Sequence, residues 1–513
     1  MQAVLSILYW PRPCARLSKR PRFFWKINMN MLTKLSRPAL APLLAALVLA
    51  GCASVPAVDP VAIAAAPAQF KGNTDQWVQA PPAEAQARGA WWRVFADPAL
   101  DALIERANQF NTDIAVSAAR LKQAQAMLRT TEADRSLQAG LGGGATRQAG
   151  AGTSNGLVPS QLIRADLQLS YEVDLFGRLG RATDAASLDA QSRAALLQST
   201  RLLVQANVAQ TYLALRAADA ERALVRETVA TYRETLNLTQ RRFEAGDLAE
   251  LDVVRLKTEV ASTEAELLAL SRRRSTLEHA LAVLVGESAS DFGIESLEDA
   301  QWQSALPVIP VGVPATVLAR RPDVAAAQSN LLAAQARVGV AQAAWFPSVS
   351  LTAAGGFASP DLGDVFKWSA RAWGVGALLS LPVFDGGRRN AEVQSMTAQF
   401  DSATAAYRGQ VLAAFREVED QLAALRLLAQ QNDVQALAVK SAKLATQMAD
   451  ARFRFGQTSQ LEVLDANRSE LRSRRQALEV RSAQYQSTVM LIRALGGGWG
   501  PPDSSTAISQ LTE

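Results

Sequence analysis

Few residues of this chain belong to the types that carry out catalysis. The only histidine, His279, lies beside the apolar run Ala280–Leu284, where packing is the more common role of an imidazole. The two cysteines, Cys14 and Cys52, are far apart, and no Cys/His cluster, phosphate-binding loop or glycine fingerprint accompanies them. Acidic pairs are frequent, but they occur in helix-forming stretches where they are ordinary surface residues. The sequence therefore predicts no enzyme, no metal site and no cofactor.

Cys52 is suited to a different kind of chemistry, the attachment of lipid. The 51 residues before it hold eight Lys or Arg and no Asp or Glu, and they contain the apolar run Ala39–Leu49. A basic flank, a short apolar run and small residues are typical of a secretory signal, since a membrane-spanning helix needs about 20 apolar residues. Leu49-Ala-Gly-Cys52 closely resembles a bacterial lipobox, which predicts a covalent lipid on Cys52. Ala53 after it favours the outer membrane; an alanine-rich run with a chance cysteine is the alternative.

Removal of this leader changes the net charge. The full chain carries a formal charge of +5, whereas the mature chain has 45 basic and 48 acidic residues and a net charge of −3. The basic character thus belongs to the leader, and nothing indicates a nucleic-acid partner. Cys52 is the only cysteine left after cleavage, so we expect neither a disulfide nor a thiolate metal site.

The elements that must position the remaining side chains repeat at a fixed offset of 210 residues. Arg242–Val254 returns as Arg452–Leu464, with Phe, Gly, Leu and an acidic residue in the same places. Other pairs at this offset are Asn111 to Ala115 with Arg321 to Ala325, Leu141 with Leu351, Leu169-Ser170 with Leu379-Ser380, and Gly177-Arg178 with Gly387-Arg388. So many matches at one offset indicate a tandem duplication. In each copy a glycine precedes an acidic residue, which predicts a helix–turn–helix tip near 243–251 and near 453–461.

The stretches on either side of each tip are predicted to be very long helices. No proline occurs between Pro159 and Pro307 or between Pro382 and Pro501, and good helix formers dominate. A 4-3-4-3 heptad seam is formed by Val411, Phe415, Val418, Leu422 and Leu425. A helix from Arg178 to Ala245 would be about 100 Å long, which requires a coiled coil, a bundle or a tube. The alanine-rich stripes favour helices packed on two neighbours in the wall of a barrel; a two-stranded stalk is the alternative.

Four stretches have the period of two that is typical of strands, near 137–147, 162–175, 347–357 and 372–384. Polar residues from Asp166 to Asp174 alternate with Leu167, Leu169, Tyr171 and Val173. A strand that is polar on one face and apolar on the other is typical of outer-membrane barrels. Four strands cannot close a barrel and open edges are not tolerated in lipid, so membrane-spanning strands require an oligomer. A small soluble sheet that caps the helices is the alternative.

Together, the lipobox, the duplication, the strand pairs and tips of the form Arg-Phe-x-x-Gly-x-x-x-x-Leu-acidic-Val resemble the TolC-type outer-membrane efflux factors, most closely their NodT/OprM-like lipoprotein branch. The segments Glu278–Gly286 and Ala344–Ser348 also match that branch. The resemblance covers essentially the whole mature chain. It implies a mainly α fold with a small membrane β part, and a homotrimer whose twelve strands form an outer-membrane barrel and whose twelve helices form a periplasmic tunnel.

The same resemblance implies a function and partners. The chain would be a passive duct that exports drugs or toxic amphiphiles, served by a periplasmic adaptor and an inner-membrane resistance-nodulation-division pump. Two other classes stay open: the exit duct of a metal-ion or protein exporter, and a lipid-anchored structural coiled coil without a channel.

The resemblance also assigns roles to the tips. In the family, acidic residues of the second tip ring the periplasmic entrance, and Glu462 and Asp465 stand at those positions. Charges that complement a helix dipole are the alternative explanation of both. Asp252 matches an acidic residue that pairs with an arginine of the second tip, but Thr458 stands in place of that arginine.

Three further tip assignments follow from the resemblance. Arg454 or Arg452 could substitute as the partner of Asp252, and Phe453 stands where the family often has a tyrosine. Contacts with the adaptor are expected at Gly246, Asp247, Leu248, Gly456, Gln457 and Thr458, for which a plain tight turn is the alternative. The predicted organisation is a leader at 1–51, an extended tether at 52–88, one repeat at 89–288, a connection at 289–318, a second repeat at 319–497 and a tail at 498–513.

Overall fold

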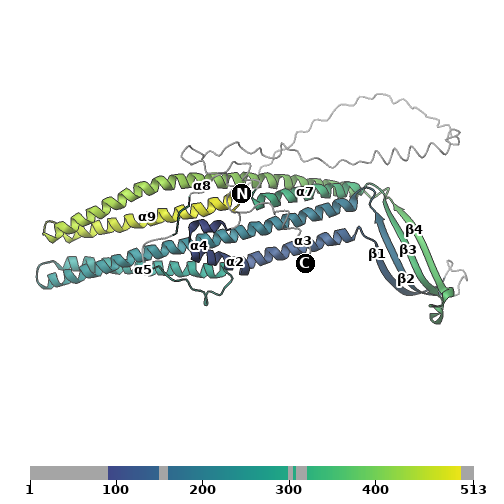
Figure 1. Cartoon of the computed structure of the whole chain (residues 1–513), viewed down its shortest axis with the longest axis horizontal. Helices are drawn as coiled ribbons and strands as arrows, with labels where there is room; N and C mark the ends of the chain where they lie inside the picture. The colour runs from purple at the N-terminus through teal and green to yellow at the C-terminus, as the bar shows by residue number, and fades with distance from the viewer. Residues whose placement is uncertain (1–89, 150–159, 298–303, 308–319, 498–513) are drawn as a thin grey trace, which may run out of the picture. The chain divides into compact units, whose positions relative to one another are not determined.

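The computed structural model describes residues 90–149, 160–297, 304–307 and 320–497, all of which belong to one compact unit, Val55–Glu513. Cys52, the predicted leader and tether and the C-terminal tail lie outside the described residues. The described part is mainly helical with one small sheet, as the sequence predicts (Figure 1). In chain order its elements are η4 (Trp91–Phe95), α2 (Pro98–Phe110), α3 (Thr112–Ala133), β1 (Gln138–Gln148), β2 (Ser160–Val173), α4 (Arg178–Glu244), α5 (Glu250–Leu284), α7 (Pro322–Ala343), β3 (Ser348–Ser359), η5 (Leu362–Asp364), η6 (Trp368–Ala370), β4 (Arg371–Ser380), α8 (Arg388–Arg454) and α9 (Gln460–Ala494).

The helices of the two repeats match residue for residue. α3 and α7 have 22 residues each, α4 and α8 have 67, and α5 and α9 have 35. Every pair begins and ends exactly 210 residues apart in the chain. α4 and α8 also begin alike, because Gly177 and Gly387 both adopt the left-handed conformation, with φ of 72° and 92°. The tandem duplication predicted from the sequence is therefore confirmed at the level of the fold.

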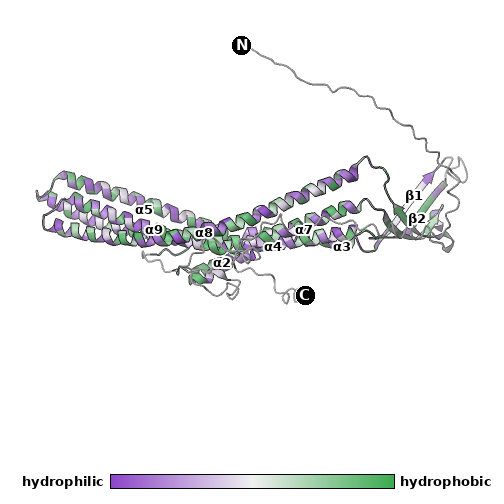
Figure 2. Cartoon of the chain, turned by 90° about the horizontal axis from the view of Figure 1, so that it is seen from above, coloured by the Kyte–Doolittle hydropathy of each residue, from purple (hydrophilic) through white to green (hydrophobic). Residues whose placement is uncertain are grey.

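The helices lie side by side in a fixed order. Next to the tips, α5 packs on α4, α4 on α9 and α9 on α8; toward the sheet, the order is α3, α4, α7 and α8. Both α4 and α8 thus run through the whole layer, while α3 and α5, and likewise α7 and α9, share one row (Figures 1 and 2). The α4–α9 and α4–α7 contacts join one repeat to the other.

Each shared row is joined end to end by the same side-chain position. Asn111 donates through Nδ2 to the carbonyl of Leu284 at 2.9 Å, which links the start of α3 to the end of α5. Its counterpart Arg321 donates through Nη1 to the carbonyl of Ala494 at 3.1 Å, which links α7 to α9. The last carbonyls of a helix lack intrahelical partners, and these side chains satisfy one of them in each repeat.

A glycine is required beside each of these joints. Gly286 and Gly496 have φ of 78° and 89°, in the left-handed region that disfavours a side chain. A Cβ on Gly286 would overlap the carbonyl of Phe110, and a Cβ on Gly496 would lie 2.9 Å from the carbonyl oxygen of Arg320. Backbone therefore approaches backbone too closely at both joints for any other residue.

The main hydrophobic core lies where η4 and α2 pack against the middle of α4 and the ends of α5 and α9. Tyr212 of α4 donates to the carboxylate of Asp97 at 2.9 Å, and Asp97 also caps α2 through Ala99 N at 3.1 Å. On the same side, the phenol of Tyr485 donates to the carbonyl of Ser304. We call this side of the helical layer the covered face.

A buried group of charges fixes residues 294–297 to the covered face. Asp219 of α4 is fully buried and receives Arg274 Nε at 2.8 Å and Arg216 Nη1 at 3.2 Å. The same guanidiniums donate to the carbonyls of Ile294 at 2.6 Å and Glu295 at 2.8 Å. Because a buried charge is costly without a partner, these arginines and their acceptors must assemble together.

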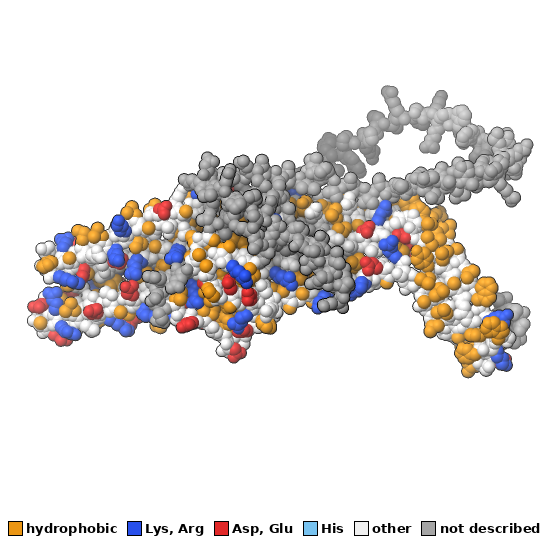
Figure 3. All heavy atoms as spheres, viewed as in Figure 1, with side chains coloured by type: hydrophobic (Ala, Val, Ile, Leu, Met, Phe, Trp, Pro, Cys, Tyr) orange, Lys and Arg blue, Asp and Glu red, His pale blue; other side chains and the backbone are white. Residues whose placement is uncertain are grey.

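The four strands form one antiparallel sheet in the order β1-β2-β3-β4. Its register places Leu141, Leu167, Gly355 and Trp373 in one row, and Asp166 lies opposite Gly142 and Gly356. Directly opposed residues share a face, so most odd-numbered positions make an apolar face and most even-numbered positions a polar one. Leu141 is 90% exposed and Trp373 78%, and hydrophobic side chains dominate this surface in Figure 3.

The last strand is shorter than its pattern predicts. The alternation runs from 372 to 384, whereas β4 ends at Ser380. Pro382 has no amide hydrogen to continue the ladder, which explains the early end. Among the helices of the described ranges, none is both long and apolar enough to cross a membrane.

Candidate gate at the helical tips

Both hairpins turn through the same backbone motif. α4 ends before Gly246, whose φ is 81°; Gly246 N donates to the Phe243 carbonyl at 2.9 Å and Asp247 N to the Arg242 carbonyl at 2.8 Å. These two bonds define a Schellman motif, in which a left-handed glycine closes the helix and satisfies its last carbonyls. A tight turn then leads directly into α5, whose first turn carries Asp252.

The second tip repeats this geometry. Gly456 has φ of 70°, and its N–H donates to the Phe453 carbonyl at 2.9 Å, while Gln457 N donates to Arg452 at 2.9 Å. A Cβ on Gly246 or on Gly456 would meet no other atom within 4 Å. The positive φ, rather than lack of space, therefore requires glycine at both tips.

Glu462 and Asp465, the predicted entrance carboxylates, lie in the first two turns of α9 with exposed side chains. Glu462 pairs with Arg452 across the turn at 3.4 Å and also accepts a hydrogen bond from the Thr458 hydroxyl. Asp465 pairs with Arg468 at 3.4 Å on its own helix. Exposed pairs of this kind contribute at most about 1 kcal/mol each, so neither pair holds the second tip strongly.

Asp252 lies in the first turn of α5 and pairs with Arg255 of the same helix at 3.9 Å. Arg454 pairs with Asp450 at 2.8 Å, again within one helix. With Arg452 bound to Glu462, neither candidate arginine pairs with Asp252 in the part of the chain that the structure describes. The Thr458 hydroxyl instead donates a hydrogen bond to the carboxylate of Glu462 in its own tip.

The contact that joins the two tips is one that the sequence analysis missed. The guanidinium carbon of Arg242, at the end of α4, lies 5.7 Å from the centre of the Phe453 ring on α8. This separation is within the range of a cation–π interaction. The resemblance placed Phe453 where the family often has a tyrosine, whereas the structure gives its ring a cationic partner from the other repeat.

Below the tips, the repeats are held by buried apolar residues and by charge. Tyr232 of α4, Leu256 of α5 and Leu464 of α9 form one cluster. Arg468 of α9 binds the carboxylate of Glu259 on α5, and this hydrogen bond raises the pKa of the arginine further above its usual value. Nothing in the local sequence signals the Arg468 contact, because its partner lies 209 residues away.

The residues expected to contact an adaptor lie at the ends of both hairpins. Gly246, Asp247, Gly456 and Gln457 are exposed, whereas Leu248 and Thr458 are half-buried. Phe455 was not predicted, yet its ring is 80% exposed beside Gly456. In the described residues, no three acidic, His or Cys side chains gather in a way that could hold a metal ion.

The fold and both tips can now be compared with known proteins. The family model of the outer membrane efflux proteins matches residues 103–287 and 313–497, which are the two repeats at the same offset of 210. The chain belongs to the outer membrane efflux protein family. As a member of this family it is an outer-membrane protein that serves efflux, and the resemblance drawn from its tips and strands is confirmed.

Individual relatives extend over nearly the whole chain. The antibiotic efflux pump outer membrane protein ArpC of Pseudomonas putida is 33% identical over 478 residues, or 91% of this chain and 96% of ArpC. The toluene efflux pump outer membrane protein TtgI of Pseudomonas putida is 32% identical over 466 residues, or 89% and 98% of the two chains. The solved outer-membrane channel OprN is 29% identical with a TM-score of 0.80, over 88% of this chain and 100% of that one.

Proposed function

We propose that this chain is the outer-membrane exit duct of a tripartite efflux pump, in which three copies enclose one passive tunnel. A periplasmic adaptor and an inner-membrane resistance-nodulation-division pump would deliver the cargo and supply the energy, so the duct itself needs no catalysis. Relatives named for antibiotic and toluene efflux support drugs and toxic amphiphiles as the cargo. A lipid on Cys52 would anchor each copy to the outer membrane.

The proposal of a trimer rests on two open edges of the helical layer, α5 on one side and α8 on the other. Within one chain, α9 of the second repeat covers α4 of the first. The 210-residue offset relates α4 to α8 and α9 to α5, so the equivalent contact is between α8 of one copy and α5 of the next. Leu464 on α9 is 3% exposed against α4, whereas its counterpart Val254 on α5 is 50% exposed.

Both open edges carry the apolar residues that such a contact would bury. Leu268 on α5 is 72% exposed, and on α8 Val434 is 70% and Leu437 64% exposed. Leu444 and Met448 continue the α8 stripe at heptad spacing, with 56% and 58% exposed. Because the missing neighbour lies on another copy, these contacts generate a ring when the rotation closes.

The sheet supports the same arrangement. The β2–β3 pairing joins the repeats within one chain, and the equivalent pairing is between β4 of one copy and β1 of the next. Three copies would supply twelve strands, with the apolar face toward lipid and the polar face toward the lumen. Closure removes the two free edges, which is the requirement for strands in a membrane.

At the other end, each copy would contribute Glu462 and Asp465 to the tunnel entrance. Six carboxylates around one narrow opening repel one another and attract cations. The tip glycines, with Asp247, Leu248, Gln457 and Thr458, would present the docking surface to the adaptor.

The test is to record planar-bilayer currents of the purified, unheated protein and of the Glu462→Ala/Asp465→Ala variant. A small, cation-preferring conductance that rises in the double variant is expected. Asp401→Ala/Asp433→Ala removes two exposed carboxylates of α8 away from the tip, and its conductance should equal that of the wild type. A pore that Glu462→Ala/Asp465→Ala leaves unchanged removes the gate but keeps the duct. A folded sample without current points instead to a lipid-anchored structural protein.

A further inference from the structure

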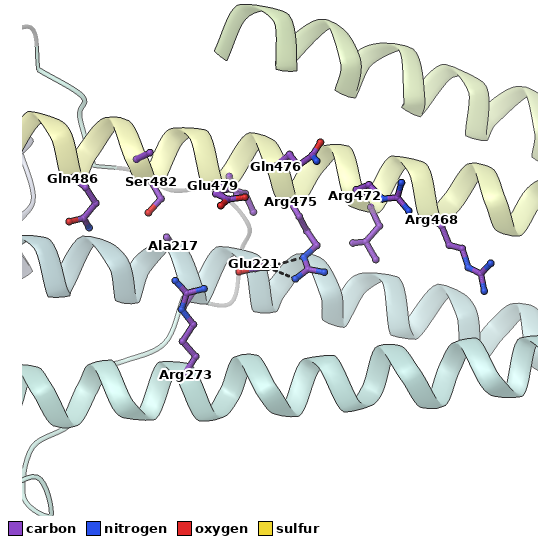
Figure 4. A pocket seen from close by; sticks show the side chains of 14 residues that line it. Ala217, Glu221, Arg273, Arg468, Arg472, Arg475, Gln476, Glu479, Ser482 and Gln486 are labelled. Atoms are coloured by element: carbon purple, nitrogen blue, oxygen red, sulfur yellow. Dashed lines mark hydrogen bonds and ion pairs between the residues drawn. The ribbon is translucent and has the colours of Figure 1, made fainter. Parts of the chain in front are cut away.

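A groove of about 640 Å³ lies along the helical layer, over α4 and between α9 and α5 (Figure 4). Four arginines line it: Arg273 from α5, and Arg468, Arg472 and Arg475 from α9. Among the described residues, two carboxylates line it, those of Glu221 and Glu479, so positive charge predominates. None of these residues belongs to the tips or to the covered face.

Two of the four guanidiniums are already engaged by the protein. Arg475 binds Glu221 of α4 at 2.8 Å and also Glu266 of α5, which fixes it across the groove. Arg468 binds Glu259 of α5 and Asp465. These pairs hold the three helices together at this level but leave little charge for a ligand.

Arg273 and Arg472 are the groups that remain available. Both are exposed, and neither has an ion-pair or hydrogen-bond partner for its guanidinium among the described residues. In Figure 4, Arg273 extends from α5 toward Ala217 of α4 at one end of the groove, while Arg472 projects from α9 toward the other end, with Arg475 and Glu221 between them. Glu479, which is also exposed, is the one lining carboxylate that holds no partner within the described ranges and offsets part of this charge.

The rest of the groove has an apolar floor and a mixed side, where Gln476, Ser482 and Gln486 of α9 also line it. Ala217 and Ala218 of α4 form its floor, and Leu471, Leu478 and Ala483 of α9 form one side. A groove of this size suits a drug-sized molecule. The combination of free guanidiniums and an apolar floor fits a ligand with an anionic group on a hydrophobic body, since a guanidinium forms charge-assisted hydrogen bonds with carboxylates, sulfonates and phosphates.

The groove lies opposite the covered face. Successive residues of a helix are rotated by about 100°, so Ala217, Ala218 and Glu221 point away from Tyr212, Arg216 and Asp219. In a ring of twelve helices with axes about 9 to 10 Å apart, the axes lie on a circle about 36 Å across. Helices about 10 Å thick leave about 25 Å inside, which three copies of α2 and its loop would fill. The covered face must therefore lie outside, and the groove inside.

We infer that this arginine groove is a binding station for anionic amphiphiles on the wall of the tunnel, with Arg273 and Arg472 as its anion-contacting residues. The lumenal position rests on the proposed duct, whereas binding itself rests only on the groove of the single chain. Cargo with a carboxylate, sulfonate or phosphate group would dwell there above the acidic entrance. The affinity of this station for its ligands is expected to be low, because the groove is open to water and a passive duct must release the molecules that it binds.

The experiment measures binding of the fluorescent anion anilinonaphthalene sulfonate to the full-length protein in lipid nanodiscs, with empty nanodiscs subtracted. Saturable binding is expected, with at most one probe at each of the two arginines. Arg273→Gln/Arg472→Gln should weaken it by up to about fivefold, because each bound anion loses one solvent-exposed charge contact. Arg273→Lys/Arg472→Lys should restore most of the affinity. Arg129→Gln/Arg408→Gln, which removes two exposed arginines outside the groove, should change nothing.

Two further measurements separate the possible outcomes. Phenylnaphthylamine, which has a similar body without the sulfonate, should bind the wild type and the Gln variant alike. Equal affinity of the anionic probe for the wild type and Arg273→Gln/Arg472→Gln overturns the station, even if the protein conducts in bilayers. A groove-dependent affinity in a protein that never conducts keeps the site but removes the duct.

Discussion

At the scale of single residues, the two tips are joined by an aromatic ring and a cation rather than by a carboxylate. Arg242 lies over the ring of Phe453. Asp252 and Glu462 instead form ion pairs with arginines of their own tips, Arg255 and Arg452. A cation–π contact at an exposed site contributes about 0.5 to 1 kcal/mol, enough to bias two states of similar energy but not to lock one of them.

This contact predicts a selective effect of ring removal at Phe453. In the proposed duct, Phe453→Leu should raise the fraction of open channels in planar bilayers about two- to fivefold, because the arrangement in which Arg242 lies over the ring loses its cation–π energy. Phe453→Tyr keeps the ring and should behave like the wild type. Phe243→Leu, at the equivalent position of the first tip, is the matched control. An equal rise in Phe453→Leu and Phe243→Leu would mean that hydrophobic packing, not the cation, holds the tips.

Two buried phenols make the fold sensitive to alkaline pH. Burial raises the pKa of Tyr232 to about 12, with a contribution from the nearby Glu259 carboxylate. Burial also raises the pKa of Tyr212 to about 12. The Asp97 carboxylate raises this pKa further, and the Arg216 guanidinium lowers it. Since the folded values exceed the ordinary value of 10.0, the stabilisation is complete below pH 10 and is lost as the pH rises toward 12.

The corresponding variant is Tyr232→Phe, followed by circular dichroism melts at pH 8 to 12. The buried Tyr232 oxygen has no hydrogen-bond partner among the described residues, so its removal should be neutral or stabilising by up to about 1 kcal/mol at neutral pH. Above pH 10 the variant should lose less stability than the wild type. Tyr171→Phe changes an exposed phenol and should show the wild-type pH dependence. Parallel pH curves for Tyr232→Phe and the wild type would contradict the assignment.

At the scale of the elements, each helix of 67 residues ends at a left-handed glycine. The next helix begins after a tight turn. The shorter helices meet end to end through Asn111 and Arg321, beside Gly286 and Gly496. These joints, rather than continuous helices, keep α3 in line with α5 and α7 in line with α9.

The joints predict that Gly286 cannot be replaced. Gly286→Ala should destabilise the protein by at least about 2 kcal/mol, because the left-handed φ and the overlap with the Phe110 carbonyl both oppose a Cβ. The measurement is the thermal midpoint of helical circular dichroism. Gly293→Ala is the matched control, since a Cβ at that position meets no atom within 4 Å. An unchanged midpoint in Gly286→Ala would show that the joint tolerates a Cβ, and an equal loss in both variants would show that the effect does not come from the joint.

At the scale of the whole molecule, the strand register obeys the same offset as the helices. Gln138 pairs with Ser170 in the first repeat and Ser348 with Ser380 in the second, both partners being shifted by 210 residues. The junction between the repeats pairs Leu167 with Gly355. The 210-residue offset relates Leu167 to Ala377 and Gly355 to Ala145. The junction therefore predicts that Ala377 of one copy lies opposite Ala145 of the next copy in the closed barrel.

Disulfide cross-linking tests that register. Ala377→Cys/Ala145→Cys should yield covalent dimers and trimers on non-reducing gels, since the two positions lie on opposite edges of one chain's sheet. Ala377→Cys/Leu141→Cys displaces the partner by four residues, about 13 Å along the strand, and should stay monomeric on the gel. Equal cross-linking of both pairs, or of neither, would rule out the predicted interface.

Much of this architecture could be predicted from the sequence because its causes are local or periodic. Local signals are the glycines and acidic residues at the tips, the unbroken helix-forming stretches and the alternating strands, which each act within a few residues. The duplication is visible in the sequence as a constant offset. The end of β4 was missed although its cause, Pro382, was visible. The roles of Glu462, Asp465 and the adaptor-contacting residues were drawn from a resemblance and stay predictions.

The sequence by itself determined the class of the elements, their lengths, their duplication and the family. Hydrophobic periodicity, turn residues and repeat spacing are properties of neighbouring positions, so no fold is needed to recognise them. Only the tertiary structure decided which side chains meet: Arg242 with Phe453, Arg468 with Glu259, Asn111 with Leu284, and the four arginines of one groove. These partners are brought together by the packing of helices from different repeats, and exposed arginines with many possible partners carry no local signal of which one they will contact.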